Sequence, residues 1–141
     1  MFRSHPNARE VSRHVTELPV DYDVRRVRDH WVVVGPTGIF VVGRARSDVV
    51  ASAEHTSALA HELRAGLSER IPWVPFVDAL LVADGDHAGL ACTVVRLDLL
   101  VVALTSGGAN IDPHGLAQVE HHLPAVLHTM DDARRRPLDP A

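Results

Sequence analysis

Two apolar runs around a turn constrain the fold of this chain more than any other feature. The first run covers residues 31–34, the second covers residues 39–42, and the four residues between them are Gly-Pro-Thr-Gly. β-branched and aromatic runs that flank such a turn are typical of a β-hairpin. Because nearly every position of both runs is apolar, both faces of the sheet should be covered. The sequence therefore predicts an α/β fold with a central hairpin flanked by helices.

Hydrophobic periodicity predicts three helices outside the hairpin. The segment 47–70 has the apolar spacing of a long amphipathic helix. A shorter helix is predicted over residues 4–17, with Ser4 as its N-terminal cap. A final helix is predicted to begin at the Asp-Pro pair of residues 112–113, and Pro124 should kink or split it.

Three further strands are predicted beside the hairpin, over residues 20–28, 76–83 and 90–95. The turn at residues 84–86 leaves open an antiparallel pairing of the last two strands. Residues 97–104 fit either a strand or a short buried helix, because periodicity does not separate the two at this length.

Length and composition favour one globular domain. The chain has 141 residues, of which 46% are hydrophobic and 23% are charged, and these values are typical of a single core. We predict one domain over residues 1–130 and a flexible tail over residues 131–141. The N-terminus lacks the apolar stretch of a secretion signal, and no run approaches the length of a membrane span. We therefore expect a soluble cytoplasmic protein without a membrane partner.

The basic residues and the single cysteine exclude several chemistries. All 14 residues of the Lys and Arg class are arginine, which excludes a Schiff-base or phosphate-loop lysine. Cys92 is the only cysteine, so a disulfide framework and a multi-cysteine metal site are excluded, and we expect a small buried residue within a strand. His55 and His61 are six residues apart and His114 and His121 are seven, whereas helical metal-binding pairs are three or four apart. We therefore predict no metal centre from the histidines.

The segment from Asp29 to Val42, DHWVVVGPTGIFVV, is similar to the core of the nuclease-related domain family, NERD. That family resembles the restriction-endonuclease-like PD-(D/E)XK nucleases. The similarity continues through the order of the predicted elements and through the Val-Pro-rich stretch at residues 73–77, and it covers residues 8–128. The resemblance implies a restriction-endonuclease-like mixed β-sheet with a central hairpin flanked by helices.

The resemblance also implies a metal-dependent phosphodiesterase site. Such a site has an Asp at the start of the first hairpin strand, and a Glu or Asp, one further residue and a Lys at the end of the second. Two carboxylates hold Mg²⁺ against a phosphate. Asp29 matches the first acid and Glu10 loosely matches an acid from the first helix, but Gly43 and Ala45 stand at the Glu and Lys positions. The resemblance thus implies a degenerate site with no cofactor, of which Asp29 and Glu10 are remnants.

The side chains around this degenerate site are not expected to rescue it. Arg44 and Arg46 alternate with the two missing groups along the strand, so they should point away from the site. An arginine is also a poor general base because it stays protonated. His30 is predicted to point to the opposite face from Asp29 and not to pair with it.

The N-terminal third of the chain is locally basic. Through residue 46 it carries 8 Arg and 5 acidic residues, whereas the whole chain has a net charge of -4. A modest patch that could meet nucleic-acid phosphates is formed by Arg25, Arg26, Arg28, Arg44 and Arg46. Given the acidic total, the interpretation that we favour for these arginines is solvated strand edges that discourage sheet-to-sheet pairing.

Three functional hypotheses follow from the sequence. We favour a catalytically inactive NERD-like module with a binding or scaffolding role, whose partner is nucleic acid or a protein. The alternative is a surviving Mg²⁺-dependent nuclease built from Asp29, Glu10 and a relocated group such as Asp48 or Arg44. The third is a structural homo-oligomer.

Overall fold

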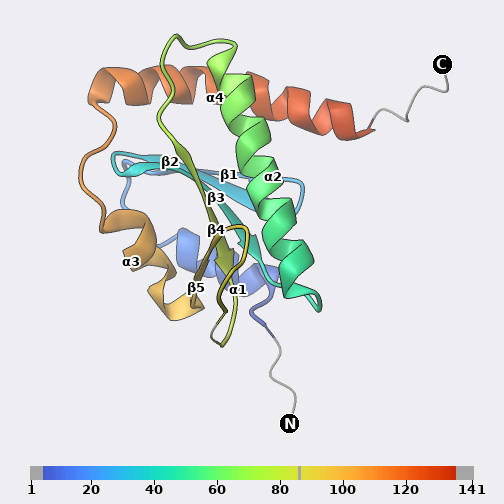
Figure 1. Ribbon diagram of the computed structural model, residues 1–141. Helices are drawn as coiled ribbons and strands as arrows, with labels where there is room; N and C mark the ends of the chain where they lie inside the picture. The colour runs from blue at the N-terminus through green and yellow to red at the C-terminus, as the bar shows by residue number, and fades with distance from the viewer. Residues whose placement is uncertain (1–4, 86, 136–141) are drawn as a thin grey trace, which may run out of the picture.

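The predicted hairpin forms the centre of a five-stranded mixed sheet (Figure 1). In the computed structural model, which describes residues 5–85 and 87–135, strands β2 (His30–Gly35) and β3 (Gly38–Arg44) pair antiparallel. β1 (Asp23–Val27) extends the sheet antiparallel to β2. On the other side, β4 (Val77–Val82) is parallel to β3 and β5 (Thr93–Val95) is parallel to β4. The sheet order is therefore β1-β2-β3-β4-β5.

Helices cover both faces of the sheet, as the apolar composition of the hairpin predicts (Figure 1). Helices α2 (Val49–Ser68) and α4 (Pro113–Arg135) pack on one face. Helix α1 (Ala8–Val15), the short 3₁₀ turn η1 (Leu97–Leu99) and helix α3 (Leu100–Thr105) lie on the other. Alternation along the strands divides the hairpin side chains between two cores. The α/β class, with helices flanking a central hairpin, is confirmed.

Two of the predicted helices have different ends in the structure. α1 begins at Ala8 because Asn7 is its N-cap and exchanges hydrogen bonds with Glu10 in a capping box, whereas Ser4 lies outside the described residues. α4 runs as one helix past Pro124, so of the two predicted effects of this proline, a kink or a split, the split is wrong. α4 also continues to Arg135, into the segment predicted as a tail, and residues 136–141 lie outside the described part of the chain.

The region after β4 differs most from the sequence prediction. The antiparallel pairing left open for β4 and β5 is wrong, because the segment between them carries the chain back so that β5 runs parallel to β4. β5 has three residues and begins after Cys92, which is half-buried and outside the strand. Residues 97–104 are helical, which resolves the open alternative. None of the helices within the described residues is both long and apolar enough to cross a membrane.

Candidate functional site

Asp29 lies in a surface hollow between the start of β2, the end of β3 and one face of α2. Two adjoining cavities of about 380 Å³ and 250 Å³ share Asp29, His30, Arg46 and His55 as lining residues. We call these two cavities together the Asp29 hollow. The larger cavity is also lined by charged and apolar side chains, namely Arg28, Ala58, Leu59 and Glu62. The smaller is also lined by Arg44, Ser47, Asp48, Ala51 and Ser52.

Both carboxylate oxygens of Asp29 have partners within the chain. Oδ1 lies 2.9 Å from Nδ1 of His30, and Oδ2 accepts a hydrogen bond of 2.6 Å from Nη2 of Arg46. The prediction that His30 faces away from Asp29 is therefore wrong, and so is the prediction that Arg44 and Arg46 point away from the site, since both line the hollow. Arg46 lies beyond the last residue of β3, so strand alternation no longer fixes its direction. The tight turn before β2 places the Asp29 carboxylate beside the His30 ring.

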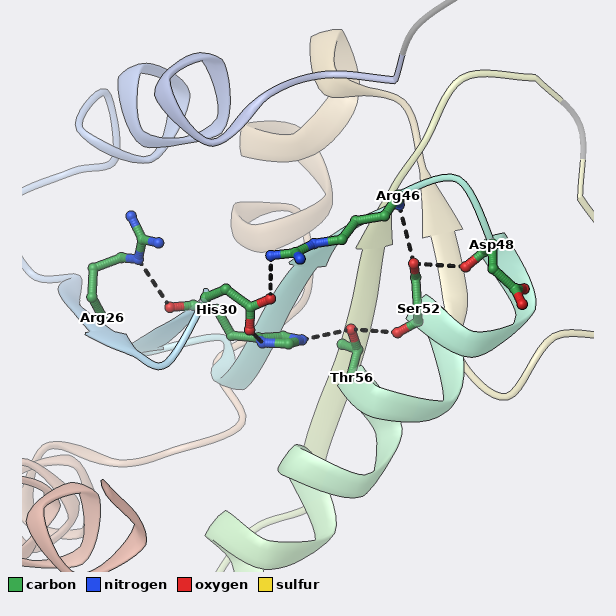
Figure 2. A network of polar contacts seen from close by, with 7 residues as sticks. Arg26, His30, Arg46, Asp48, Ser52 and Thr56 are labelled. Atoms are coloured by element: carbon green, nitrogen blue, oxygen red, sulfur yellow. Dashed lines mark hydrogen bonds and ion pairs between the residues drawn. The ribbon is translucent and has the colours of Figure 1, made fainter. Parts of the chain in front are cut away.

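His30 continues the network into the buried face of α2 (Figure 2). Its Nε2 lies 2.9 Å from Oγ1 of Thr56, whose side chain is fully buried, and Oγ1 lies 3.0 Å from the carbonyl oxygen of Ser52. When His30 is neutral and carries its proton on Nδ1, the Thr56 hydroxyl can donate to Nε2. When His30 is protonated, Nε2 donates to Oγ1 and the hydroxyl turns to Ser52. The network thus satisfies both ring nitrogens in either state.

Gly43 adjoins the same network. A Cβ added at Gly43 would overlap Oγ1 of Thr56 and would lie 2.9 Å from Nε2 of His30. The His30–Thr56 hydrogen bond therefore fills the space where the resemblance implies a metal-binding Glu. Ala45, at the implied Lys position, is 1% exposed and packs in an apolar cluster.

These residues do not fit a Mg²⁺ site. Mg²⁺ requires convergent oxygen ligands, and Asp29 has no second carboxylate at the Gly43 position. Throughout the part of the chain that the structure describes, no group of three or more His, Cys, Asp or Glu side chains could hold a metal ion. Asp48, the proposed relocated acid, caps α2 by accepting a hydrogen bond of 3.1 Å from the Ala51 amide. Glu10 is used in the α1 capping box and is not among the residues that line the hollow.

Burial and charge shift the pKa values of Asp29 and His30 downward. Burial by itself raises the pKa of Asp29, but the positive charge of His30, hydrogen bonds from its own backbone and from His30, and the charge of Arg46 outweigh it. Burial lowers the pKa of His30 and outweighs the opposing attraction of Asp29. Neutral His30 is therefore the favoured form near neutral pH.

We expect the His30→Gln variant to flatten the acid side of the stability profile. An unfolded chain takes up a proton on this histidine near pH 6.5, whereas the folded chain does so only at lower pH. The unfolded state therefore binds more protons in that window, and wild-type stability falls as the pH decreases through it. Chemical denaturation at a series of pH values should show the stability advantage of wild type over His30→Gln shrinking below about pH 6.5. Parallel profiles would contradict the shifted pKa.

The turn that presents Asp29 holds Arg28 in a strained conformation. Arg28 has a φ of 54°, in the left-handed region that favours glycine. Its guanidinium contacts both carboxylate oxygens of Glu62 at 3.2 Å and donates a hydrogen bond of 2.9 Å to the Met130 carbonyl. These contacts join the β1–β2 turn to α2 and α4 and hold the non-glycine residue in place.

The strain at Arg28 predicts an unusual order of stabilities. Arg28→Ala and Arg28→Gly both lose the contacts with Glu62 and Met130, but only Gly relieves the positive φ. We expect the free energy of unfolding of Arg28→Gly to be about 1 kcal/mol higher than that of Arg28→Ala. At Arg25, in a strand with ordinary φ, the order of Ala and Gly should reverse. Denaturant titration of the four variants tests this, and the same order at both positions would refute the role of strain.

The five arginines of the predicted patch do not form one surface. Arg28, Arg44 and Arg46 line the Asp29 hollow. Arg25 pairs with Asp23 at 2.8 Å and lines a separate depression that also contains Asp21 and Glu120. Arg26 stacks over the Trp31 ring at 4.1 Å and donates to the His30 carbonyl. The structure therefore brings together three of the five predicted residues.

The sequence reasoning missed Thr56, and it considered His55 only as half of a metal-binding pair with His61. Thr56 occupies a position in the apolar stripe of α2, between buried Ala53 and Leu59. A polar residue within such a stripe indicates a buried hydrogen bond, and that signal was available in the sequence. His55 follows the stripe on the exposed side, and no local pattern distinguishes it from a solvated residue.

Comparisons of the chain with protein-family models, with curated proteins and with solved structures find no match. The structure itself provides the α/β architecture with its mixed sheet and the arrangement of charged groups around Asp29. The geometry of the Asp29 hollow is therefore the basis for a functional assignment.

Proposed function

We propose that this chain is a restriction-endonuclease-like domain, similar to the nuclease-related domain family, that has lost metal-dependent catalysis and acts by binding. The order of elements supports the fold: a helix, a strand, the β2–β3 hairpin, a long helix and a strand parallel to β3 follow one another. The observation that carries the loss of catalysis is the filled space at Gly43. A metal-binding side chain there would displace the hydrogen bond between His30 and Thr56.

The charges around Asp29 support the same proposal. In a metal-dependent nuclease, a divalent cation lies against the first acid and neutralises it. Here the Arg46 guanidinium takes that position, with Nη2 2.6 Å from Oδ2, and His30 engages Oδ1. A cation competing for Asp29 would have to break both contacts. Asp29 thus acts as an internal partner for Arg46.

A plasmid-nicking assay with Mg²⁺ or Mn²⁺ tests the loss of catalysis. We expect no nicking by wild type above the level of Asp29→Ala, because one carboxylate engaged by Arg46 and His30 holds these ions too weakly. Glu17→Ala is a matched control, since Glu17 is exposed and outside the hollow. Nicking that requires Asp29 but not Glu17 would overturn the proposal and favour the relocated nuclease.

The proposed binding role belongs to the Asp29 hollow more than to an extended basic surface. A nucleic-acid strand is held by several phosphate contacts spread along a positive face. Arg25 lies among acidic residues and Arg26 is engaged with Trp31, so such a face is interrupted. The hollow, in contrast, gathers three guanidinium groups in one place. This arrangement favours a compact, negatively charged group as the ligand, carried by nucleic acid, a protein or a small molecule.

A further inference from the structure

Two guanidinium groups at the Asp29 hollow contain buried donors without acceptors. Among the described residues, Nε of Arg28 and Nε of Arg44 are the buried side-chain nitrogen or oxygen atoms that lack a hydrogen-bond partner. Both residues line the hollow, one in each cavity. Buried donors are nearly always satisfied in folded proteins, so these two orphans mark guanidinium groups that the chain leaves incompletely paired. A ligand in the hollow would meet the terminal nitrogens of such a group, since the Nε atoms themselves are covered.

Arg44 is the more available of the two. Arg28 is already engaged with Glu62 and Met130, whereas no hydrogen bond or ion pair of the Arg44 side chain is found among the described residues. Arg44 is half-buried at the end of β3 and lines the smaller cavity. An unpaired guanidinium fixed on a strand is a preorganised donor for a planar or tetrahedral oxyanion.

The neighbours of Arg44 add further donors to the smaller cavity. Arg46 is 57% exposed and uses Nη2 for Asp29, so its other nitrogen atoms remain accessible. Ser47 and His55 also line the cavity. Figure 2 shows Arg46 held at its backbone, where its amide donates to Oγ of Ser52 at 3.0 Å, while its side chain reaches across the hollow. Its guanidinium can therefore turn from Asp29 to a ligand without movement of the strand.

Acidic groups in the same cavity favour a compact anion over a long polyanion. Asp48 and Asp29 both line it, so its formal charge is balanced and a long polyanion gains little from it. The Asp48 carboxylate accepts a hydrogen bond from the Ala51 amide, and the Asp29 carboxylate forms an ion pair with Arg46. A compact oxyanion that competes with Asp29 for Arg46 and meets Arg44 fits this balance.

We propose that the smaller cavity binds a single phosphate group, held by Arg44 and Arg46, with Asp29 as the internal competitor. This inference rests on the proposed function, because it requires Asp29 to serve Arg46 and not a metal ion. The ligand is inorganic phosphate or a terminal phosphomonoester of a nucleotide or strand. All of these present the same oxygens to the two guanidinium groups.

Titration with inorganic phosphate at constant ionic strength, followed by amide chemical shifts, tests the proposal. We expect saturable binding by wild type, and about tenfold or greater weakening in Arg44→Gln. Asp29→Asn should bind phosphate more tightly than wild type, because it releases Arg46. Arg70→Gln is the matched control: Arg70 lies past the opposite end of α2 and should leave the affinity unchanged. Unchanged affinity in Arg44→Gln, or weaker binding in Asp29→Asn, would overturn the proposal.

Stability separates this role of Arg44 from a structural one. In chloride without phosphate, Arg44→Gln should be at least as stable as wild type, because it removes an unsatisfied buried donor. A large loss of stability there would assign Arg44 a structural role and contradict the proposal.

A 5′-phosphorylated thymidine dinucleotide and its 5′-hydroxyl counterpart distinguish the two sources of the phosphate group. If only the phosphorylated dinucleotide binds, and binds more tightly than inorganic phosphate, the ligand is the end of a strand. If it binds with the same affinity as inorganic phosphate, the site recognises the phosphate group itself.

The outcomes for phosphate and for nicking are independent. Absence of phosphate binding together with absence of Asp29-dependent nicking would remove this inference and leave the proposed function standing. Asp29-dependent nicking would remove the proposed function whatever the phosphate titration gives.

Discussion

The Gly43→Ala variant is expected to lose about 3 kcal/mol of unfolding free energy, with a melting temperature about 10 °C lower. A Cβ at this position overlaps Oγ1 of Thr56 and lies 2.9 Å from Nε2 of His30. Neither atom belongs to the end of a flexible side chain, since Thr56 is fully buried in α2 and His30 is buried at the start of β2. The added methyl group must therefore separate α2 from β3 or break the His30–Thr56 hydrogen bond.

Gly108→Ala is the matched control for this prediction. Nothing lies within 4 Å of a Cβ built at Gly108, and its φ is not in the left-handed region, so the substitution should leave stability unchanged. Combining Gly43→Ala with Thr56→Ala removes one of the overlapping atoms. The double variant should be less destabilised than the sum of the two single variants, measured by denaturant titration. Additive effects, or a stable Gly43→Ala, would show that the space beside Gly43 is not filled as described.

The fold was more accessible from the sequence than the site because its signals are local. Two apolar runs around a Gly-Pro-Thr-Gly turn predict the hairpin, and a periodic apolar stripe predicts the long helix. These signals depend on residues within about a dozen positions of one another. The direction of β5 depends on how the segment between β4 and β5 runs, and an Asp-Gly turn signal alone does not reveal that.

The site was accessible only in part because its contacts join distant segments. Asp29, Gly43 and Ala45 could be singled out from the sequence by the resemblance along the hairpin, which stays a prediction. The hydrogen bond from Arg46 to Asp29 could not, because strand alternation applies only within the strand and Arg46 lies beyond it. The partner of His30 on α2 requires the packing of that helix against the hairpin. The sequence therefore predicts which residues lie along the hairpin better than which contacts they make with other elements.

The Thr56→Val variant is expected to lose about 2 kcal/mol of unfolding free energy. Val has nearly the shape of Thr, so packing in the fully buried position is preserved and only the hydroxyl is lost. Without Oγ1, Nε2 of His30 has no partner within 3.5 Å among the contacts that the structure describes, since its one hydrogen bond is to that atom. A buried polar atom left unsatisfied costs more than the hydrogen bond itself contributes, which is why the expected effect is large for so small a change.

Thr129→Val separates this effect from the ordinary cost of replacing a helical threonine. Thr129 lies in α4 and, like Thr56, has its hydroxyl 3.0 Å from the carbonyl oxygen four residues earlier, but its described hydrogen bond is to that carbonyl and not to a histidine. Both variants lose the contact with that carbonyl and both gain an apolar β-branched side chain. Thr129 is exposed whereas Thr56 is fully buried, so their difference combines the His30 contact with the cost of the buried position. Denaturant titration should give Thr56→Val a much larger loss than Thr129→Val. Equal losses would mean that the hydrogen bond to Thr56 does not hold His30, and the reason for excluding a carboxylate at Gly43 would then reduce to steric overlap alone.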